Sequence, residues 1–312
     1  MARAILLLPA ARRLGAPSAA VATALGRADV AAGLGEGRRA QLRRSFRLLP
    51  DHWPVAALTR QLDAGDAAGA AWLRADPCRI QADINGARLL DHGDTLGLDA
   101  EDAAQLLPAL RTVFGDAGMP IDAPTPTRWY LRLAPSTPLP AFTEPDDALG
   151  DDVFEHLDPG GQGRRWRSLL TEAQVILHNH PWNARRIAAG KRPVNSLWFW
   201  GGGELPDQVR SPHARVCTGD GLAAALAAAA GVGAPLPARF DAAADGGDVA
   251  YDLTALRDMR TLERDWLEPA LDALGAGRIA SLVLDTADGT AFTLARGHRW
   301  RIWRRRRAGF HA

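Results

Sequence analysis

The chain has 312 residues, 47% of them hydrophobic and 23% charged, and its 37 basic and 36 acidic side chains leave a net charge of +1. These values exclude an intrinsically disordered protein. The balanced charge excludes a strong global attraction to nucleic acid or to a membrane surface. The two cysteines, Cys78 and Cys217, form no CxxC motif, and no apolar run reaches membrane-spanning length. We therefore expect a cytoplasmic protein without a membrane partner.

Apolar periodicity and turn residues predict strands alternating with helices, and therefore an α/β fold. The predicted strands are Ala4–Leu8, Gly69–Leu73, Arg79–Asp83, Trp129–Leu133, Val194–Trp200, Ala250–Leu253, Ile279–Asp285 and Thr290–Ala295. The predicted helices are Trp53–Leu62, Asp99–Phe114, Arg165–His178, Leu222–Ala230 and Leu256–Leu274. A turn at Ala75-Asp76-Pro77 is expected to separate two of the strands. The segments 135–152 and 233–247 are expected to be loops, and Ala287-Asp288-Gly289 to close a hairpin.

The segment 171–203, TEAQVILHNHPWNARRIAAGKRPVNSLWFWGGG, is unusually rich in polar and aromatic side chains and carries the only lysine of the chain, Lys191. It resembles the archaeal-type cofactor-independent phosphoglycerate mutases, in which HPxNxxRxxxGKxPxN leads into LWxWGxG. The positions that match this pattern are His180, Pro181, Asn183, Arg186, Gly190, Pro193, Asn195, Trp198, Trp200, Gly201 and Gly203.

Further segments resemble a bacterial offshoot of that family, the RpfE-type regulatory proteins. They are WLRADPCRI at 72–80, RWYL at 128–131, LERDWLEPAL at 262–271 and the terminal WRR at 303–305. The likeness to the offshoot spans most of residues 70–307, whereas the likeness to the mutases is specific only for about 75–235. The resemblance implies a mixed sheet with flanking helices. Residues 1–70 and 236–312 would form a degenerate alkaline-phosphatase-like core, and residues 71–235 an inserted substrate domain.

Two interpretations of the signature residues stay open. Amide and guanidinium groups hold phosphate and carboxylate oxygens well, so His180, Asn183, Arg186 and Asn195 can bind a ligand. The resemblance implies an anionic, phosphorylated small molecule. Alternatively, the same side chains lock turns together. His178 and His180 are two positions apart at the end of a predicted helix. This spacing suits metal binding from a strand rather than from a helix, so we expect His180 to cap a helix instead.

The triple glycine is predicted to be a structural turn, with Trp198 and Trp200 on the strand before it. Glycine backbones can bind anions, but Glu204 follows directly and its charge repels phosphate. The glycines and tryptophans of the motif are therefore assigned a structural role, together with Pro181, Gly190 and Pro193.

The mutases that the segment resembles need two metal ions and a serine or threonine nucleophile. In this chain the first predicted strand is followed by Pro9-Ala10-Ala11-Arg12, and neither GDHxxP nor GxSxG occurs. The group DHGDT at 91–95 is expected to be a surface turn. We therefore assign no catalytic residue, no metal site and no cofactor.

The C-terminal stretch Arg299–Arg307 holds six arginines and two tryptophans. Such a strip can bind nucleic acid, but its alternation after a predicted hairpin favours an edge strand with one buried face. The function that we expect is therefore a non-catalytic cytoplasmic regulatory or ligand-binding protein, a pseudoenzyme derived from the mutases, with a protein partner left open. The alternatives are a residual mutase or phosphatase, and a nucleic-acid-binding regulator acting through the arginine-rich end.

Overall fold

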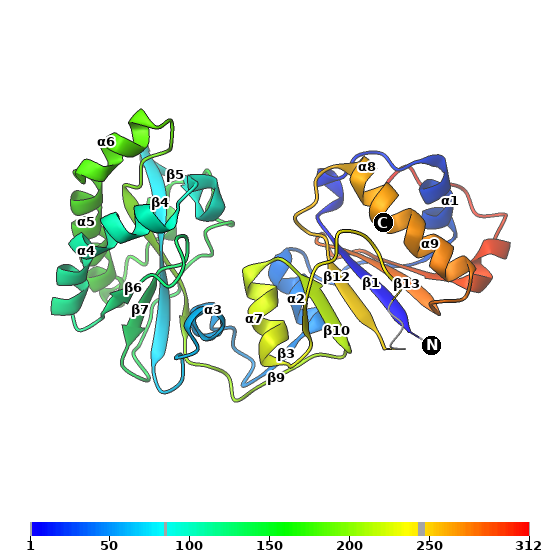
Figure 1. Cartoon of the computed structure of the whole chain (residues 1–312), viewed down its shortest axis with the longest axis horizontal. Coiled ribbons are helices and arrows are strands. Elements are labelled where there is room, and N and C mark those ends of the chain that lie inside the picture. The colour runs from blue at the N-terminus through cyan, green and yellow to red at the C-terminus, as the bar shows by residue number, and fades with distance from the viewer. Residues whose placement is uncertain (1, 84–85, 243–246, 312) are drawn as a thin grey trace. The chain divides into compact units, whose positions relative to one another are not determined.

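The computed structural model describes residues 2–83, 86–242 and 247–311. It divides into two compact units, residues 1–51 with 207–312 (unit 1) and residues 52–206 (unit 2). Each unit combines a sheet with flanking helices (Figure 1), so the predicted mixed α/β fold is confirmed. The boundaries differ from those expected at 70/71 and 235/236. Helix α3 (Val55–Ala64) packs on strands of unit 2, while β9 (Gln208–Arg210) and β10 (Arg215–Thr218) pair with strands of unit 1.

Unit 1 is built on a seven-stranded sheet with the order β11-β10-β12-β1-β13-β14-β2. Strand β1 (Arg3–Leu8) lies in the middle and pairs in parallel with β12 and β13 on its two sides (Figure 1). Its sequence RAILLL is buried at five of six positions, which is typical of a strand covered on both faces. The other strands of this sheet are β2 (Asp29–Ala31), β11 (Gly233–Pro235), β12 (Val249–Asp252), β13 (Ser281–Thr286) and β14 (Ala291–Ala295).

The helices of unit 1 pack against this sheet. Strands β3 (Arg47–Leu49) and β9 form a separate antiparallel pair. The helices are α1 (Ala19–Arg27), α2 (Arg38–Ser45), α7 (Gly221–Ala229), α8 (Met259–Leu262) and α9 (Glu268–Gly275), with short 3-10 turns at Ala11–Arg13 and Arg296–Trp300. The single helix predicted over 256–274 is wrong in detail. A π-helical stretch, Glu263–Leu267, separates α8 from α9, because Pro269 has no N–H for the carbonyl of Asp265. That carbonyl accepts the N–H of Phe240 instead, at 2.7 Å.

Unit 2 is organised around one long strand, β4 (Ala71–Asp83), which pairs with β5, β7 and β8. The turn predicted at Ala75-Asp76-Pro77 is wrong, because the strand continues through it. Pro77 aligns with Leu197 of β8, and the Arg74 and Asp76 side chains form a buried ion pair at 2.7 Å. The remaining strands are β5 (Gly86–His92), β6 (Ile121–Asp122), β7 (Tyr130–Leu133) and β8 (Ser196–Gly203).

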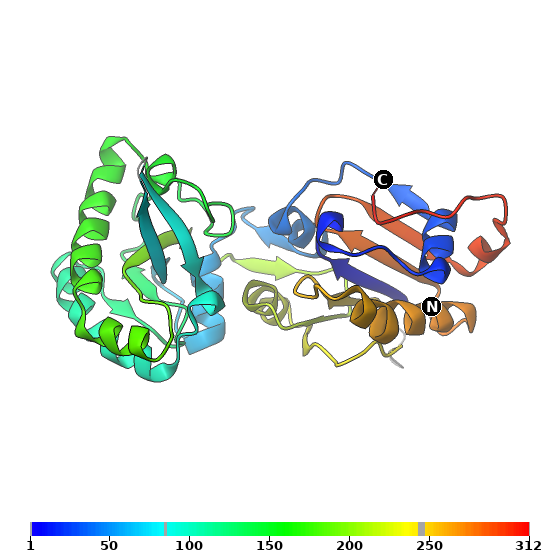
Figure 2. The same ribbon diagram turned by 90° about the horizontal axis from the view of Figure 1, so that it is seen from above.

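Helices α4 (Ala100–Asp116), α5 (Gly161–His178) and α6 (Pro181–Ala188) lie on the same side of β4 (Figures 1 and 2). Asp99 caps α4 as predicted, and its side chain accepts the N–H of Asp102 at 2.9 Å. Short 3-10 turns occur at Gly93–Leu96 and Val153–His156. The core between helices and sheet is rich in aromatic side chains, among them Phe114, Trp129, Trp166 and Phe199.

The structure differs from three further sequence-based expectations. The edge strand predicted at the C-terminus is wrong, because Arg296–Trp300 forms a 3-10 turn and residues 301–311 form no strand. The DHGDT group is only partly a surface turn, since Asp91 is buried in β5 and forms ion pairs with Arg79 and Arg192. The loop expected at 233–247 begins with β11, and its residues 243–246 lie outside the described part of the chain. Among the described residues, no helix has both the length and the apolar character needed to cross a bilayer.

Candidate functional site

The signature segment forms the joint between α5, α6 and β8. His180 is the N-cap of α6, as predicted, and its Nδ1 accepts the N–H of Trp182 at 3.2 Å. Burial lowers the pKa of His180, which favours the neutral imidazole that this contact requires. The Asn183 amide donates to the carbonyls of Leu177 and Val194 and accepts the N–H of Val194 at 2.9 Å. It therefore ties the end of α5 to the segment that enters β8.

Arg186 lies at the centre of this joint, and its side chain is only 1% exposed. Its guanidinium forms an ion pair with Asp102 of α4 and donates to the carbonyls of Leu96 and Arg192 at 2.7 and 3.0 Å. Burial disfavours the charged form of Asp102, but hydrogen bonds from Arg186 and Trp182 outweigh it and hold the Asp102 pKa at about 2. Arg186 and Asp102 thus form a fully engaged buried pair.

Lys191, the only lysine, extends this network to the surface. Its Nζ lies 2.7 Å from the Asp99 carboxylate and 3.3 Å from that of Asp102. The hydrogen bond to Asp99 raises the pKa of Lys191, and the same bond lowers the pKa of Asp99. The side chain of Lys191 is 37% exposed, so it remains within reach of solvent.

Asn195 faces β4 rather than the helices. Its side chain accepts the N–H of Ile80 at 2.8 Å and donates to the Ile80 carbonyl at 2.7 Å. It therefore reproduces a strand pairing at the point where β8 begins. Asn183 and Asn195 both lie next to Val194 but contact different elements. The side chains of Asn183, Arg186 and Asn195 each donate hydrogen bonds to protein groups. These contacts correspond to structural locking, and direct ligand contact by the four signature residues stays a prediction.

The aromatic and glycine positions that follow fit β8 into unit 2. Trp200 donates its indole N–H to Asp76 at 2.7 Å, and Trp198 donates to the Thr143 carbonyl at 2.9 Å. Gly201 has a φ of +66°, and a Cβ there would lie 2.9 Å from Cβ of Val55 in α3. Gly203 is similarly close to Pro54. The glycines let β8 pass directly against the start of α3. Pro181 starts α6, and Gly190 lies just after it with a φ of +73°, which glycine adopts without strain.

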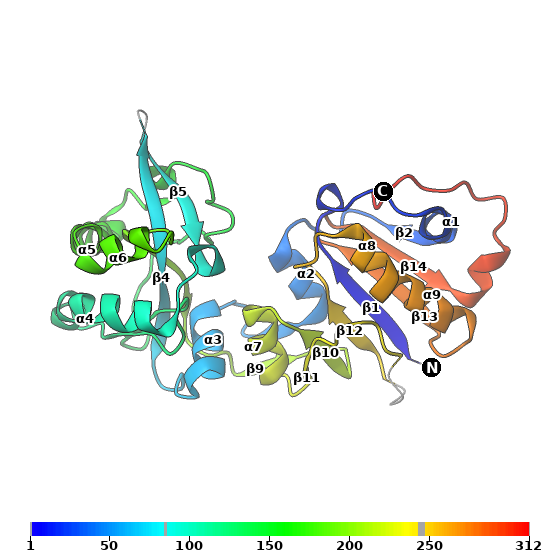
Figure 3. The ribbon, with the colours of Figure 1, turned by 45° about the horizontal axis from the view of Figure 1, so that its top comes forward.

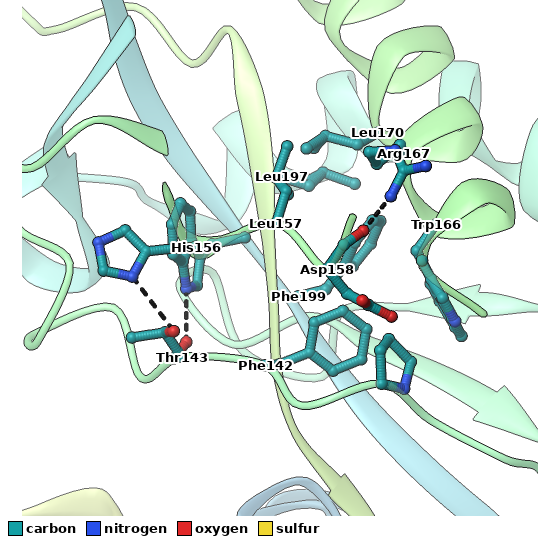
Figure 4. A pocket seen from close by; sticks show the side chains of 13 residues that line it. Phe142, Thr143, His156, Leu157, Asp158, Trp166, Arg167, Leu170, Leu197 and Phe199 are labelled. Carbon is teal, nitrogen blue, oxygen red and sulfur yellow. Dashed lines mark hydrogen bonds between the residues drawn. The ribbon is translucent and has the colours of Figure 1, made fainter. Parts of the chain in front are cut away.

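An aromatic cavity lies beside β8 in the same unit (Figure 4). Phe142, Trp166 and Phe199 form its apolar wall, and His156 contacts the Thr143 hydroxyl at 3.2 Å. The space that admits the centre of a water molecule is only about 20 Å³, which is room for about one water. The Arg167 guanidinium donates to the backbone carbonyl of Asp158 at its edge. As it stands, this cavity holds no room for a metabolite.

Unit 1 carries a second cluster of polar side chains, at the carboxyl ends of its parallel strands. Ligands in open α/β sheets bind at this edge. Asp252 ends β12 and Asp285 lies near the end of β13, so both carboxylates flank the end of β1. Both are buried. Neither carboxylate was predicted as a site residue, although each is an acidic residue at or near the end of a predicted strand.

Two arginines of α2 neutralise these carboxylates. Arg38 lies 2.5 Å from Asp252, which also accepts hydrogen bonds from the hydroxyls of Thr218 and Thr254 at 2.7 and 2.6 Å. Arg44 holds Asp285 with two parallel hydrogen bonds of 2.9 and 2.6 Å. The fork of a guanidinium matches a carboxylate and fills the directions that a metal ion would use.

The residues at this edge therefore do not fit a two-metal centre. Such a centre needs several anionic or imidazole ligands around the same point, without a fixed cation among them. Across residues 2–83, 86–242 and 247–311, no group of three or more His, Cys, Asp or Glu side chains has the geometry to hold a metal ion. Just after the end of β1, Ala11 donates its N–H to the Asp288 carboxylate at 2.8 Å.

Comparison with known proteins finds similarity over part of the chain. No protein-family model matches. A protein of Geobacter sulfurreducens named probable 2,3-bisphosphoglycerate-independent phosphoglycerate mutase is 42% identical over 62 residues, which cover 20% of this chain and 16% of that protein. The 2,3-bisphosphoglycerate-independent phosphoglycerate mutase of Methanosarcina barkeri is 41% identical over 64 residues, with the same coverage. The matched segment thus spans only 16% of the length of these curated relatives.

Two solved structures are similar over most of the chain at low identity. The cofactor-independent phosphoglycerate mutase of Thermoplasma acidophilum has a TM-score of 0.45 and 16% identity, covering 95% of this chain and 90% of its own. The PH0037 protein of Pyrococcus horikoshii has a TM-score of 0.47 and 12% identity, covering 94% and 87%. The sequence matches confirm the resemblance to cofactor-independent phosphoglycerate mutases, whereas the finer likeness to RpfE-type regulatory proteins stays a prediction.

Proposed function

We propose that this relative of the cofactor-independent phosphoglycerate mutases is a non-catalytic, cytoplasmic regulatory or ligand-binding protein of the RpfE type. The observation that carries the proposal is the pairing of Arg38 with Asp252 and of Arg44 with Asp285. A guanidinium supplies positive charge, but it cannot activate a bound hydroxyl or water as a divalent ion does. The pairing supports an edge of the sheet whose buried carboxylates are neutralised by protein cations rather than by metal ions.

The proposed ligand is an anionic, phosphorylated small molecule, as the shared segment suggests. In the structure Arg186 is enclosed, whereas Lys191 and Arg192 are exposed by 37% and 53% at the surface of the same joint. These two cations support an anion more readily than Arg186 does, because their charges reach solvent. Binding there would compete with Asp99 for Lys191 and with Asp91 for Arg192.

Two measurements on the purified full chain test the proposal. A coupled mutase assay with Mn²⁺, Co²⁺ or Mg²⁺ should show no turnover, and elemental analysis should show no bound metal at stoichiometric level. Chelator-sensitive turnover would instead establish a residual mutase or phosphatase. Calorimetry with 3-phosphoglycerate should show binding that Lys191→Gln weakens about tenfold, a value typical of one charge-assisted hydrogen bond. The matched control is Arg111→Gln, an exposed cation on α4 of the same unit. Equal effects of both variants would contradict this location of the ligand.

A further inference from the structure

The C-terminal segment 296–307, which we call the tail surface, exposes apolar side chains to an unusual degree. Trp300, Ile302 and Trp303 are 67%, 77% and 74% exposed, and they are the three most exposed large hydrophobic side chains of the described residues. They occur within four consecutive positions. Singly exposed apolar residues are ordinary, but a contiguous group marks an interaction site.

The tail surface is held against unit 1 at its middle and at its C-terminal end. Arg301 donates to the Asp29 carboxylate at 2.5 Å, and the N–H of Arg307 donates to the Ala22 carbonyl of α1 at 3.0 Å. Beyond it, Phe310 is buried and packs edge-on against Phe292, with ring centroids 6.3 Å apart. Figure 3 shows this red segment leaving β14 and passing α1. The exposed apolar and basic residues therefore belong to one segment that is anchored to unit 1.

The charge around this loop is strongly one-sided. Residues 289–312 contain seven arginines and no acidic residue, a formal charge of +7. The rest of the chain then holds 30 basic and 36 acidic residues, a charge of −6, which together give the net +1. Since charges in physiological salt act over only about 8 Å, the local excess decides what binds here.

We propose that the tail surface docks the protein peripherally on an anionic lipid bilayer. Tryptophan prefers the boundary between headgroups and acyl chains, and an aliphatic side chain such as Ile302 gains by entering that layer. Arginines around them contact lipid phosphates while their alkyl stems lie along the apolar region. Single-stranded nucleic acid fits less well, because Ile302, the most exposed of the three, offers no ring for base stacking. A bilayer partner differs from the expectation that the chain has no membrane partner, which rested on its balanced net charge and on the lack of an apolar run of membrane-spanning length.

Sedimentation with vesicles tests this directly. The full chain should bind phosphatidylcholine vesicles that contain about one third phosphatidylserine and should not bind pure phosphatidylcholine. The double variant Trp300→Ala, Trp303→Ala should bind at least about tenfold more weakly. Its control is Phe154→Ala in unit 2, which removes an aromatic side chain of similar exposure, 65%. Arg305→Gln with Arg306→Gln should also weaken binding about tenfold, whereas Arg111→Gln with Arg164→Gln should not.

Several outcomes would overturn the proposal. One is an absence of binding to the anionic vesicles, and another is an equal loss in the tail and control variants. A third is tight binding of a labelled oligothymidine that depends on Trp300 and Trp303 without any vesicle binding, since the tail surface would then serve nucleic acid. Because the substituted side chains are exposed, unchanged thermal unfolding of each variant separates lost docking from lost folding.

Discussion

Replacing Arg186 by methionine should destabilise unit 2 by about 3–5 kcal/mol, the cost typical of removing one partner from a buried ion pair. The substitution keeps most of the apolar volume but leaves the Asp102 carboxylate, which is 3% exposed, without its guanidinium. The carbonyls of Leu96 and Arg192 lose their donors as well. Lys191 and Trp182 still contact Asp102, so the loss should lie towards the lower end of this range.

The pH dependence of stability provides a second, independent measure of what the charged Asp102 contributes. The Asp102 pKa is about 2 in the fold against an ordinary value of 3.8. This difference corresponds to about 2 kcal/mol of stability that is present above about pH 4 and is lost as the pH falls towards 2. Without Arg186, burial acts against the charged carboxylate and raises its pKa. The acid-unfolding midpoint of Arg186→Met should therefore lie at higher pH than that of the unaltered chain.

Hydrogen exchange resolved on peptides of α4 and α6 is the suitable assay, because it reports on unit 2 separately from unit 1. The matched control is Arg185→Met, which removes the neighbouring exposed arginine that stacks over Trp182 at 5.2 Å. It should cost less than about 1 kcal/mol. A loss below about 1 kcal/mol for Arg186→Met, or similar losses for both variants, would refute a structural role for the buried pair.

Three further predictions concern folding. Gly201→Ala should lower the stability by about 2–3 kcal/mol, because the added Cβ would crowd Val55 and the residue has a φ of +66°. The control Gly190→Ala, at a φ of +73° but in open space, should cost only about 1 kcal/mol. Equal losses in thermal unfolding would contradict this. Asn195→Ala should lower the free energy of unfolding in urea by about 2 kcal/mol, because both hydrogen bonds to Ile80 are lost. The control Asn179→Ala, at an exposed position, should lower it by less than about 1 kcal/mol. The reverse ranking would contradict the strand-pairing role of Asn195. Burial lowers the pKa of His213 below 6.5, so the folded chain binds fewer protons there than the unfolded chain and loses stability as the pH falls below about 6.5. His213→Asn should make the stability depend less steeply on pH in this range. An unchanged pH dependence would exclude His213 as its source.

Much of the fold could be predicted from local signals. The buried strand Ala4–Leu8, the capped helix beginning at Asp99 and the hairpin around Gly289 each depend on residues close together in the sequence, and the structure contains all three. The errors arose where a distant partner decides the outcome. Asp76 and Pro77 suggest a turn, but Arg74 and the neighbouring strand β8 keep the segment extended.

The candidate sites show the same limit. The capping role of His180 follows from its position before Pro181, so it could be predicted. The enclosure of Arg186 could not, because Asp102 lies 84 positions earlier in the sequence. Likewise, Arg38 and Arg44 look like solvated residues of a basic helix until Asp252 and Asp285 are found beside them. The exposure of Trp300 and Trp303 depends on where the chain turns after β14, which alternation alone does not reveal.

The central position of β1 has a consequence for synthesis on the ribosome. Its two neighbours, β12 and β13, begin at Val249 and Ser281. The pairing of β1 with them can therefore form only after these later segments have been synthesised. Residues 52–206 form one uninterrupted stretch and can complete their internal contacts much earlier. Domains generally fold as units during synthesis. While unit 2 is made, the apolar strand Ala4–Leu8 therefore lacks its native partners β12 and β13. Transiently exposed apolar segments of this kind are prone to aggregation, which is the situation that chaperones relieve.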